Sequence, residues 1–523
     1  MMFHRGIAAV PFAAALLFAA WQARDGALKV SIIDVAAGRP TPARVRLLDE
    51  DGKRPAAVPD GAVGVLWGRN DRAEGFSFAS GDAFYADGSF SARLHSGRWR
   101  LRVSKGFEYL PVSETLDVTP GSSLEREIRL ERWIDMPARG WYSSDDHIHV
   151  QRSPRDDPAI LRWIAGEDIH VGNILEMGDF WATYFTQYAF GPEGRYREDG
   201  RILSPGQEEP RTPEIGHTIS LGAAQLVRFR DDYYNYARYF DRVHALGGIS
   251  GFAHQAVSFH GYRGMVLTAL AGKVDFLELA QFCVDEGPLA TRFYYQFLDL
   301  GIPLTALAGS DYPWCGRGKR YGLDENWAQI GNARFYTYVG GDLTFDKWFA
   351  AVKAGRTFAT TGPMLEFTVN GKLPGERIDV KPNARLRIRA AAFGQSEHVP
   401  LERLEIVVHG NVVAHADGSR EKLEIDLELP VDHGVWIAAR AKAGPGQSAH
   451  TTPVYVTVDG GGFENPETFS RNLRMAGEYL EELEQELASP REGLNRQASR
   501  HEARLRELIA AARRRLDAMA AKR

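Results

Sequence analysis

A short run of acidic and imidazole side chains, SDDHIH at residues 144–149, is the first place where this sequence could do chemistry. Because the side chains of a strand alternate between its two faces, His147 and His149 would present two imidazoles to the same side. Two neutral imidazoles on one face are a common pair of ligands for a transition metal. The pair alone is open to another interpretation, since two histidines can also stand on a hydrated face of a sheet.

Further residues of metal-binding type follow later strand-like runs of the chain. They are Glu208 in GQEEP, His217 in GHTISLG, His254 in GGISGFAH and Asp311 in LTALAGSDYPW. Each has an ordinary alternative: Glu208 as a solvated carboxylate with Glu209 as an equal candidate, the histidines as hydrogen-bonded core or surface residues, and Asp311 as a turn residue. However, the same pattern recurs along the chain: an apolar run is followed by a small residue and then by a residue of metal-binding type. The set, taken with the first two histidines, therefore predicts one shared metal site.

The surrounding segments predict the elements that must position these residues. Between 133 and 361, apolar strand-like runs (169–175, 218–221, 248–252, 274–279, 304–308) alternate with helix-like stretches (158–165, 231–246, 289–300, 345–354). Strand and helix in repeating order are typical of an α/β layer or barrel, in which ligands collect at the carboxyl ends of the strands. The candidate ligands lie at such ends, in agreement with this prediction.

The regions on either side of this central part have a different sequence pattern. Residues 28–132 and 362–459 consist of short alternating segments broken by Gly, Pro and Asp turns, and each region predicts a β-sandwich. After a glycine-rich hinge at 460–462, residues 463–523 carry apolar positions at three- and four-residue spacing, which predicts two amphipathic helices joined at Ser489-Pro490. We expect this helical tail to fold as a hairpin onto the body of the protein or onto a partner subunit. In the second case it would build a homo-oligomer.

The first 23 residues have the layout of a secretory signal peptide. A short basic start at His4 and Arg5 precedes an apolar run at 7–20, and small and polar residues follow. This run of 14 residues is shorter than the ~20 that a membrane-spanning helix needs, so a membrane anchor is the weaker alternative and no stable membrane span is expected. We expect export with cleavage near residues 20–23, and therefore a periplasmic or extracellular protein.

Composition and charge limit the classes of protein that fit. Of 523 residues, 44% are hydrophobic and 25% charged, which indicates a globular chain long enough for several domains. A formal net charge of -5 provides no basic field, and nucleic acid is not an expected partner. The only two cysteines, Cys283 and Cys315, follow adjacent predicted strands, and both free thiols and one bridge stay open.

Taken together, these motifs resemble the PHP (polymerase and histidinol phosphatase) metallohydrolases, and in particular their carbaryl-hydrolase-like branch, CehA/McbA. The resemblance covers roughly residues 133–376 and is carried by SDDHIH, SPGQE, GHTISLG, GGISGFAH, DFLEL, AGSDYP and the run AGRTFATTGPMLEFTVNGKLPGE at 354–376. It implies a distorted (β/α)7 barrel with two or three divalent metals at the carboxyl ends of its strands. The expected fold class is therefore multidomain, with a PHP-like barrel flanked by an N-terminal and a C-terminal β-sandwich and followed by a helical hairpin.

The resemblance also assigns roles residue by residue. It implies that the metal ligands are His147, His149, Glu208, His217, His254 and Asp311, with Glu208 as the bridging carboxylate. Two departures favour one or two metals over three. The Thr-Asp-His of the family is here EMGD at 176–179, which leaves Asp179 as a stand-in, and the closing Asp-x-His is DYP at 311–313. Zn, Mn and Fe all suit such ligands.

The function that follows is hydrolysis by an exported, metal-dependent enzyme. A divalent ion lowers the pKa of bound water to about 7, so that metal-bound hydroxide could attack an ester, carbamate or amide bond of a small molecule. Asp311 and His254 are the candidate catalytic residues, and the Asp311 carboxylate could take the proton of the water. An aromatic cluster could line a pocket for an aromatic substrate, although such runs are more often packing. Its members are Phe180, Trp181, Tyr184, Phe185 and Tyr188.

Two other functions stay open on the sequence. A phosphoesterase of the PHP type should place Arg or Lys near the metals, and the candidates are Arg211, Arg317, Lys319 and Arg356. A non-catalytic secreted binding protein on a degenerate barrel would explain the missing Asp-x-His. The binding protein predicts weak or single metal occupancy, whereas the enzyme predicts Glu208 at a loaded metal centre.

Overall fold

The computed structural model describes residues 25–522 apart from 70–71, 77, 255, 284–286, 317–327, 419–420 and 489–499. The expected signal peptide and the Ser489-Pro490 junction lie outside these residues. The chain divides into two compact units. The first holds the described residues before Leu66 together with Gly75–Ile134 and Ala165–Asp168, and the second holds Leu66–Glu74, Asp135–Ile164 and the described residues from Ile169 onward.

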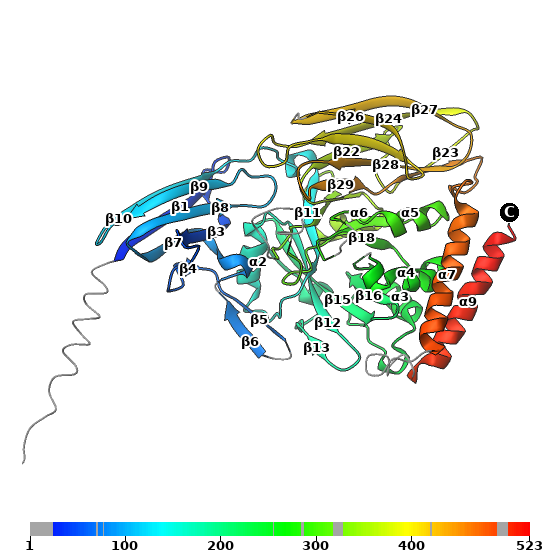
Figure 1. Cartoon of the computed structure of the whole chain (residues 1–523), viewed down its shortest axis with the longest axis horizontal. Coiled ribbons are helices and arrows are strands. Elements are labelled where there is room, and N and C mark those ends of the chain that lie inside the picture. Colours follow the sequence, from blue (N-terminus) through cyan, green and yellow to red (C-terminus); the bar gives the residue numbers. More distant parts are fainter. Residues whose placement is uncertain are drawn as a thin grey trace, which may run out of the picture. The chain divides into compact units, whose positions relative to one another are not determined.

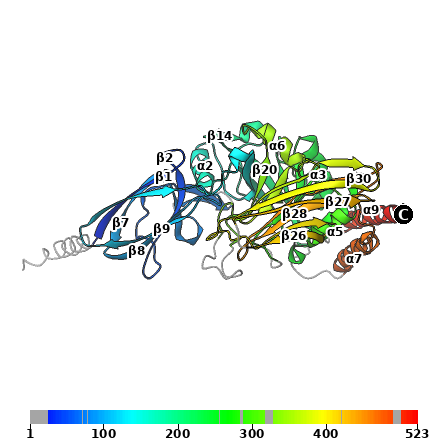
Figure 2. The same cartoon turned by 90° about the horizontal axis from the view of Figure 1, so that it is seen from above.

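The first unit is built on one eight-stranded sheet (blue and cyan in Figure 2). Its strands are β1 (Asp25–Asp34), β2 (Arg39–Pro40), β3 (Pro42–Asp49), β4 (Asp60–Ala62), β7 (Ala83–His95), β8 (Gly97–Ser104), β9 (Val112–Val118) and β10 (Ser123–Leu130). They lie in the order β10-β1-β7-β3-β8-β9, with β2 and β4 paired to β1 and β7. Apolar residues alternate with polar ones, as in β1, where Leu28, Val30 and Ile32 are buried. Their side chains form the core of this unit together with Trp99.

The second unit is built on a seventeen-stranded mixed sheet, and the predicted (β/α)7 barrel is wrong. The strands before the C-terminal region are β11 (Trp141–Ile148), β12 (Val171–Gly178), β13 (Thr183–Tyr184), β14 (Tyr196–Glu198), β15 (Arg201–Thr212), β16 (Gly216–Leu221), β17 (Ile249–Phe252), β18 (Phe276–Ala280), β19 (Thr305–Ala308), β20 (Arg334–Tyr338) and β21 (Thr357–Thr360). A (β/α) barrel needs parallel strands throughout, but β11–β20, β15–β16, β16–β17 and β20–β21 pair antiparallel. The described chain is also mostly β, with thirty strands and seven α-helices.

The physical reason is clearest where a connection is too short for a crossover helix. Three residues, 213–215, join β15 to β16, so that these strands form a hairpin, whereas a parallel pair needs a connection of a dozen or more residues. Parallel pairing is kept between β11 and β12, β12 and β15, β17 and β18, and β18 and β19. The carboxyl ends of these strands therefore meet at one edge, together with the amino end of β16.

Short helices lie in the connections of this region, and two strands form a separate ribbon. The helices are α2 (Asp157–Gly166), α3 (Tyr236–Ala245), α4 (Gly261–Thr268), α5 (Arg292–Asp299) and α6 (Phe345–Lys353). The ribbon consists of β5 (Val65–Arg69) and β6 (Arg72–Phe76). The buried apolar side chains of α3, α4, α5 and α6 belong to the same core as those of the strands.

The C-terminal strands form two sheets, one of which continues the large sheet (yellow to brown in Figure 1). A three-stranded antiparallel sheet contains β22 (Met364–Val369), β24 (Ala384–Phe393) and β27 (Lys422–Val431). The large sheet takes in β23 (Arg377–Val380), β25 (Arg403–Val408), β26 (Asn411–Asp417), β28 (Val435–Lys442), β29 (Ser448–Thr451) and β30 (Val454–Val458). Because β29 pairs with β21, the region 362–459 is joined to the central strands and is not a free-standing sandwich.

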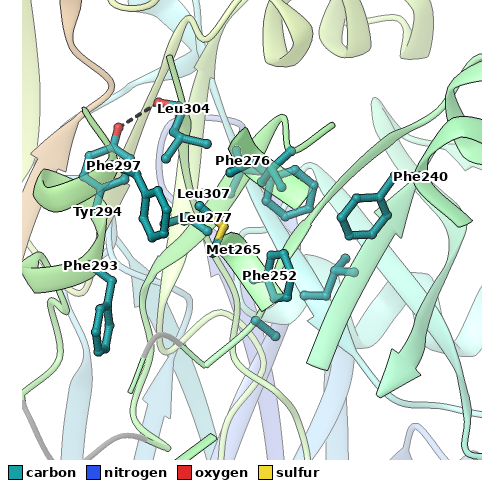
Figure 3. Packing of buried hydrophobic residues seen from close by; sticks show 14 of the residues in the cluster. Phe240, Phe252, Met265, Phe276, Leu277, Phe293, Tyr294, Phe297, Leu304 and Leu307 are labelled. Carbon is teal, nitrogen blue, oxygen red and sulfur yellow. Dashed lines mark hydrogen bonds between the residues drawn. The ribbon is translucent and has the colours of Figure 1, made fainter. Parts of the chain in front are cut away.

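The large apolar core of the second unit includes the C-terminal helices. Aromatic side chains such as Phe252, Phe276 and Phe297 lie in this core, where they pack with aliphatic residues (Figure 3). The helices α7 (Phe469–Ala488) and α9 (Glu502–Ala520) lie side by side, and both contact α4 (Figures 1 and 2).

The helical tail packs on its own chain through apolar and charged contacts. Leu483 and Ile509 are buried in the core. On α4, the Arg263 guanidinium lies 3.3 Å from Glu482 and 2.6 Å from Glu486. The structure therefore shows the hairpin on the body of the protein. No helix in the described part of the chain has the length and apolarity needed to span a membrane.

Replacing Leu483 by alanine should destabilise the protein. Removal of a buried leucine side chain loses apolar contacts and leaves a cavity, which costs about 2–5 kcal/mol. The matched control is Glu481→Ala at an exposed position of the same helix, where we expect a change within about 0.5 kcal/mol. The thermal unfolding midpoints of wild type and both variants measure the difference. Equal midpoints would contradict the packing of α7 on the body.

Candidate metal centre

The end of β11 places the two histidines of the HxH pair in the interior. His147 and His149 are buried, and their Nε2 atoms are 3.1 Å apart. Between Asp145 and Ile148 the register of β11 against β12 shifts, an irregularity of the kind that redirects side chains next to functional sites. Two imidazole nitrogens consequently point toward a common centre.

The Asp145 carboxylate fixes this strand end to two other segments. Its Oδ1 accepts hydrogen bonds from the backbone N–H groups of His147 and Ser310, at 2.9 and 3.0 Å, and its Oδ2 accepts one from Gly331 at 2.8 Å. Burial raises the pKa of Asp145 to about 6, although these hydrogen bonds oppose the shift. Asp145 thus holds β11, the segment after β19 and the segment before β20 in one arrangement.

Glu208 on β15 lies between the histidines. Its Oε2 is 3.3 Å from His149 Nε2, and its Oε1 is 2.8 Å from Nδ1 of His217, the second residue of β16. The hairpin explains this contact, because the amino end of β16 lies beside the carboxyl end of β15. Glu209 instead receives a hydrogen bond from Arg228 Nε at 2.8 Å, and burial raises the pKa of Glu209 to about 7. The structure places Glu208, and not Glu209, in the cluster.

His254 and Asp311 complete the cluster from the ends of β17 and β19. Asp311 Oδ1 is 3.3 Å from Nε2 of both His147 and His149, and Asp311 Oδ2 is 3.7 Å from His254 Nε2. Both residues have a left-handed backbone conformation, with φ of 51° for His254 and 47° for Asp311. Such conformations are unfavourable for residues other than glycine and concentrate at functional sites, where surrounding contacts enforce them.

A further set of contacts orients the imidazoles. His147 Nδ1 is 3.0 Å from Glu278 Oε1, and His254 Nδ1 is 2.9 Å from Gln281 Oε1, so that each Nδ1–H can donate to an oxygen. The Nε2 lone pairs then face the cluster, as a metal ligand requires. Glu278 is itself held, because its Oε2 accepts hydrogen bonds from the backbone N–H of His254 at 3.0 Å and from the Gln281 amide at 2.8 Å.

Glu278 and Gln281 were not among the residues predicted to form the site. Glu278 is the one charged residue of β18, FLELA, in which every residue is buried. A lone carboxylate in an apolar strand needs a partner, because burial of an unpaired charge is very unfavourable. This pattern is a signal that could have identified Glu278, whereas nothing local in the sequence marks Gln281.

The electrostatics of the cluster favour an added positive charge. Burial opposes protonation of His147, but the Asp311 and Glu278 carboxylates raise the pKa of His147 well above its usual value. Burial likewise opposes ionisation of Glu208, but Arg211 and the neighbouring histidines hold the pKa of Glu208 well below its usual range. Protons on imidazoles thus balance buried carboxylates, a role that a divalent cation can take over.

The donor atoms fit one or two divalent cations. Three overlapping groups have ligand atoms within 4.8 Å of one another: His147-His149-Glu208, His147-His254-Asp311 and Glu208-His217-His254. Glu208 Oε1 and His217 Nδ1 lie 2.8 Å apart without hydrogen-bond geometry, as two ligands of one cation would. The structure therefore brings all six predicted ligands together, and their imidazole nitrogens and carboxylate oxygens suit Zn, Mn or Fe.

Asp179 does not join this cluster. Its Oδ1 accepts hydrogen bonds from the backbone N–H groups of Trp181 and Ala182, both at 2.8 Å, and its Oδ2 accepts one from the Tyr184 hydroxyl at 3.0 Å. These contacts stabilise a turn after β12. The residue that stood in for the Thr-Asp-His of the family therefore has a structural role.

Part of the predicted aromatic group borders the cluster. The Phe185 ring centroid is 5.3 Å from that of His149, and the exposed Trp314 ring is 6.4 Å from Phe185. Phe180 instead packs against Tyr233. The Phe259 ring stacks on another ligand candidate, His254, with centroids 4.6 Å apart.

The two cysteines form a disulfide beside the cluster, which settles the alternative that the sequence left open. Cys283 follows β18 and Cys315 follows β19. Their Sγ atoms lie 3.3 and 3.2 Å from Asp311 Oδ2. The bridge therefore borders the carboxylate that the histidines of the cluster also contact.

Comparisons with known proteins assign no family. No family model and no curated protein matches the sequence. Among solved structures, phospholipase PlaB from Legionella pneumophila matches with 13% identity and a TM-score of 0.14, over 22% of this chain and 26% of that chain. A likeness at this TM-score carries no argument about fold or function.

Glu278→Gln should weaken metal binding while every direct ligand stays in place. Without the carboxylate, the His147 ring is held less firmly and its Nε2 is less basic. Loss of such a partner lowers metal affinity about 10–100-fold. Titration of the apoprotein with Zn²⁺ against a chelating indicator measures the affinity. Glu366→Gln, which alters an ion pair with Arg139 elsewhere, is the control and should bind like wild type. An unchanged affinity of the Glu278 variant would contradict the proposed orienting contact.

Proposed function

We propose that the protein is a metal-dependent hydrolase that cleaves an ester, carbamate or amide bond of a small molecule. The observation that carries this proposal is the largely buried cluster of four imidazoles and two carboxylates at one edge of the large sheet. Ionisable groups with shifted pKa values that gather in the interior are a frequent mark of a functional site. The resemblance of the ligand motifs to PHP metallohydrolases supports the same reaction class, independently of the barrel, which the structure lacks.

The six residues of the cluster would hold one or two divalent ions, and no serine or cysteine nucleophile is then required. They are His147, His149, Glu208, His217, His254 and Asp311. When bound, such an ion lowers the pKa of a water molecule and polarises the oxygen of the scissile bond. The remaining chemistry consists of proton transfer and exclusion of bulk water, for which the chain offers its own groups.

Asp311 is the best-placed acceptor for the proton of the attacking water. Burial would raise the pKa of Asp311, but His147, His149 and His254 hold that pKa below its usual value, so the carboxylate stays ionised. A carboxylate within hydrogen-bonding reach of the water can act as general base. His254, whose Nε2 is 3.7 Å from Asp311 Oδ2, is the second candidate catalytic residue, and it could give a proton to the leaving group in a one-ion centre that leaves Nε2 unligated and protonated.

The aromatic border of the cluster favours a substrate with an apolar group. Phe185 and Phe259 lie beside His149 and His254, so that apolar rings border two of the candidate ligands. Trp314 is 51% exposed and extends this apolar surface toward solvent. An aryl or alkyl group of an ester or carbamate could bind there.

A phosphoesterase is the second candidate, and Arg211 is the observation that favours it. Arg211 Nε lies 3.5 Å from Glu208 Oε1, and its side chain is 22% exposed, so that the guanidinium borders the cluster and also reaches solvent. A guanidinium in this position could bind phosphoryl oxygens. Arg356 pairs with Glu376 instead, at 3.1 Å, and the other two basic candidates, 317 and 319, lie outside the described residues.

A secreted binding protein could contain the same centre without turnover. Measurement of turnover therefore distinguishes the hydrolase from the binding protein.

We propose export to a periplasmic or extracellular space on the N-terminal sequence alone.

The first experiment is elemental analysis of the purified protein, followed by assays of aryl ester, aryl carbamate and phosphoester substrates with and without a chelator. We expect one or two divalent ions per chain and turnover that the chelator abolishes. His147→Ala/His149→Ala should lose bound metal and at least about 100-fold in kcat/KM. His433→Ala, at an exposed imidazole, is the control. A metal-free protein, or turnover that persists in the double variant, would exclude the proposal, and a loaded but inert protein would favour the binding protein.

Arg211→Met separates the two candidate reactions. A hydrogen bond to a charged group contributes about 1.5–3 kcal/mol, so kcat/KM for a phosphoester should fall about 10–100-fold, and kcat/KM for a neutral aryl ester should fall much less. Arg356→Met is the matched control, because its guanidinium pairs with Glu376. Equal losses for both substrates would show that Arg211 supports Glu208 and does not select phosphate.

A further inference from the structure

Asp311 lies between two groups of possible ligand atoms. Its Oδ1 is 3.3 Å from Nε2 of His147 and of His149, inside the histidine cluster. Its Oδ2 is 3.3 Å from Cys283 Sγ and 3.2 Å from Cys315 Sγ. The same oxygen lies 3.7 Å from His254 Nε2. The two sulfur atoms and the carboxylate therefore make a second group of ligand type, of which the proposed hydrolytic centre uses Asp311 alone.

The sulfur atoms could bind a metal ion as thiolates, although not as a disulfide. Two thiolates and a carboxylate are three of the four ligands of a tetrahedral site for a thiophilic ion such as Zn²⁺. With Zn–S bonds of about 2.3 Å, the two sulfur atoms of such a site would be about 3.8 Å apart. Rotation of the two side chains can give this separation, since the Cα atoms of Cys283 and Cys315 are 4.9 Å apart.

The surroundings favour a bound ion over two free thiolates. Cys315 is 2% exposed and packs with Phe282 and Ala333, and Cys283 lies against the same apolar cluster. Isolated thiolates are unfavourable in apolar surroundings, and a divalent cation would neutralise them. Cys283 is half-buried, so that a reductant can approach its sulfur atom from solvent.

We propose that reduction of the Cys283–Cys315 disulfide opens a second metal site, which consists of the two thiolates and Asp311 and takes one thiophilic divalent ion. A thiolate of a dithiol reductant attacks Cys283 Sγ and breaks the Sγ–Sγ bond, and the second thiol of the reductant then displaces Cys283. Two electrons pass to the protein, the dithiol becomes a disulfide, and both cysteine protons go to solvent when the ion binds. The site goes beyond the proposed hydrolase and shares only Asp311 with it.

Cobalt binding tests this site with a readout that does not depend on activity. The full-length protein is reduced with an immobilised dithiol, separated from it without oxygen, and titrated with Co²⁺ beside the oxidised protein. We expect one additional Co²⁺ per chain in the reduced protein, with a sulfur-to-cobalt charge-transfer band that the oxidised protein lacks. Equal cobalt content in both states and no such band would overturn the proposal.

Two variants, each checked for folding by circular dichroism, make the result specific. Cys283→Ser/Cys315→Ser should show neither the additional ion nor the band in either state. His147→Ala/His149→Ala should keep the band after reduction, and its loss in that folded variant would overturn the assignment to the sulfur pair. The metal content of the oxidised protein tests the hydrolase proposal separately. An oxidised protein without metal that gains the band on reduction would contradict the hydrolase and support this site.

Discussion

The Asp145 carboxylate joins the segments on which the candidate metal centre depends. It accepts backbone hydrogen bonds from His147, Ser310 and Gly331, which lie in three separate parts of the chain. Hydrogen bonds to a charged group contribute about 1.5–3 kcal/mol each, so this one buried acceptor fixes the end of β11 against the segment after β19. Gly309 makes the close approach possible, because a Cβ at that position would lie 2.5 Å from the Cβ of His147. Ligands that are distant in sequence thereby come within reach of one ion.

Much of the candidate centre could be predicted, because ligand types at strand ends are local features of a sequence. The two histidines at the end of β11 and the ligand candidates that follow β17 and β19 come from strands that run in one direction. The carboxyl ends of these strands meet at one edge of the sheet. His217 belongs to the same edge because it begins a strand of the opposite direction. The local sequence does not decide between Glu208 and Glu209. The decision depends on which face of β15 lies toward the histidines, and strand pairing sets that face.

The fold could not be predicted in the same way, because strand direction is set by connections and packing. Alternation of strand and helix is visible in the sequence, and the resemblance to a barrel family added to it, but the hairpin at 213–215 and the antiparallel β20–β21 pair exclude a parallel barrel. The orienting residues escaped prediction for a related reason. Glu278 is 131 residues from its partner His147. The spacing of residues along the chain does not reveal a contact over such a separation.

The pairing of β21 with β29 limits how this protein can be rearranged in evolution. Phe358, Ala359 and Thr360 form a ladder with Thr451, His450 and Ala449, so that the last central strand has no free edge toward the C-terminal strands. Loss of those strands would expose unpaired N–H and C=O groups, which invite pairing with another chain and aggregation. The C-terminal strands are consequently not an exchangeable module. A gene fusion or truncation with its boundary between β11 and β30 would leave an incomplete sheet on both sides of the cut.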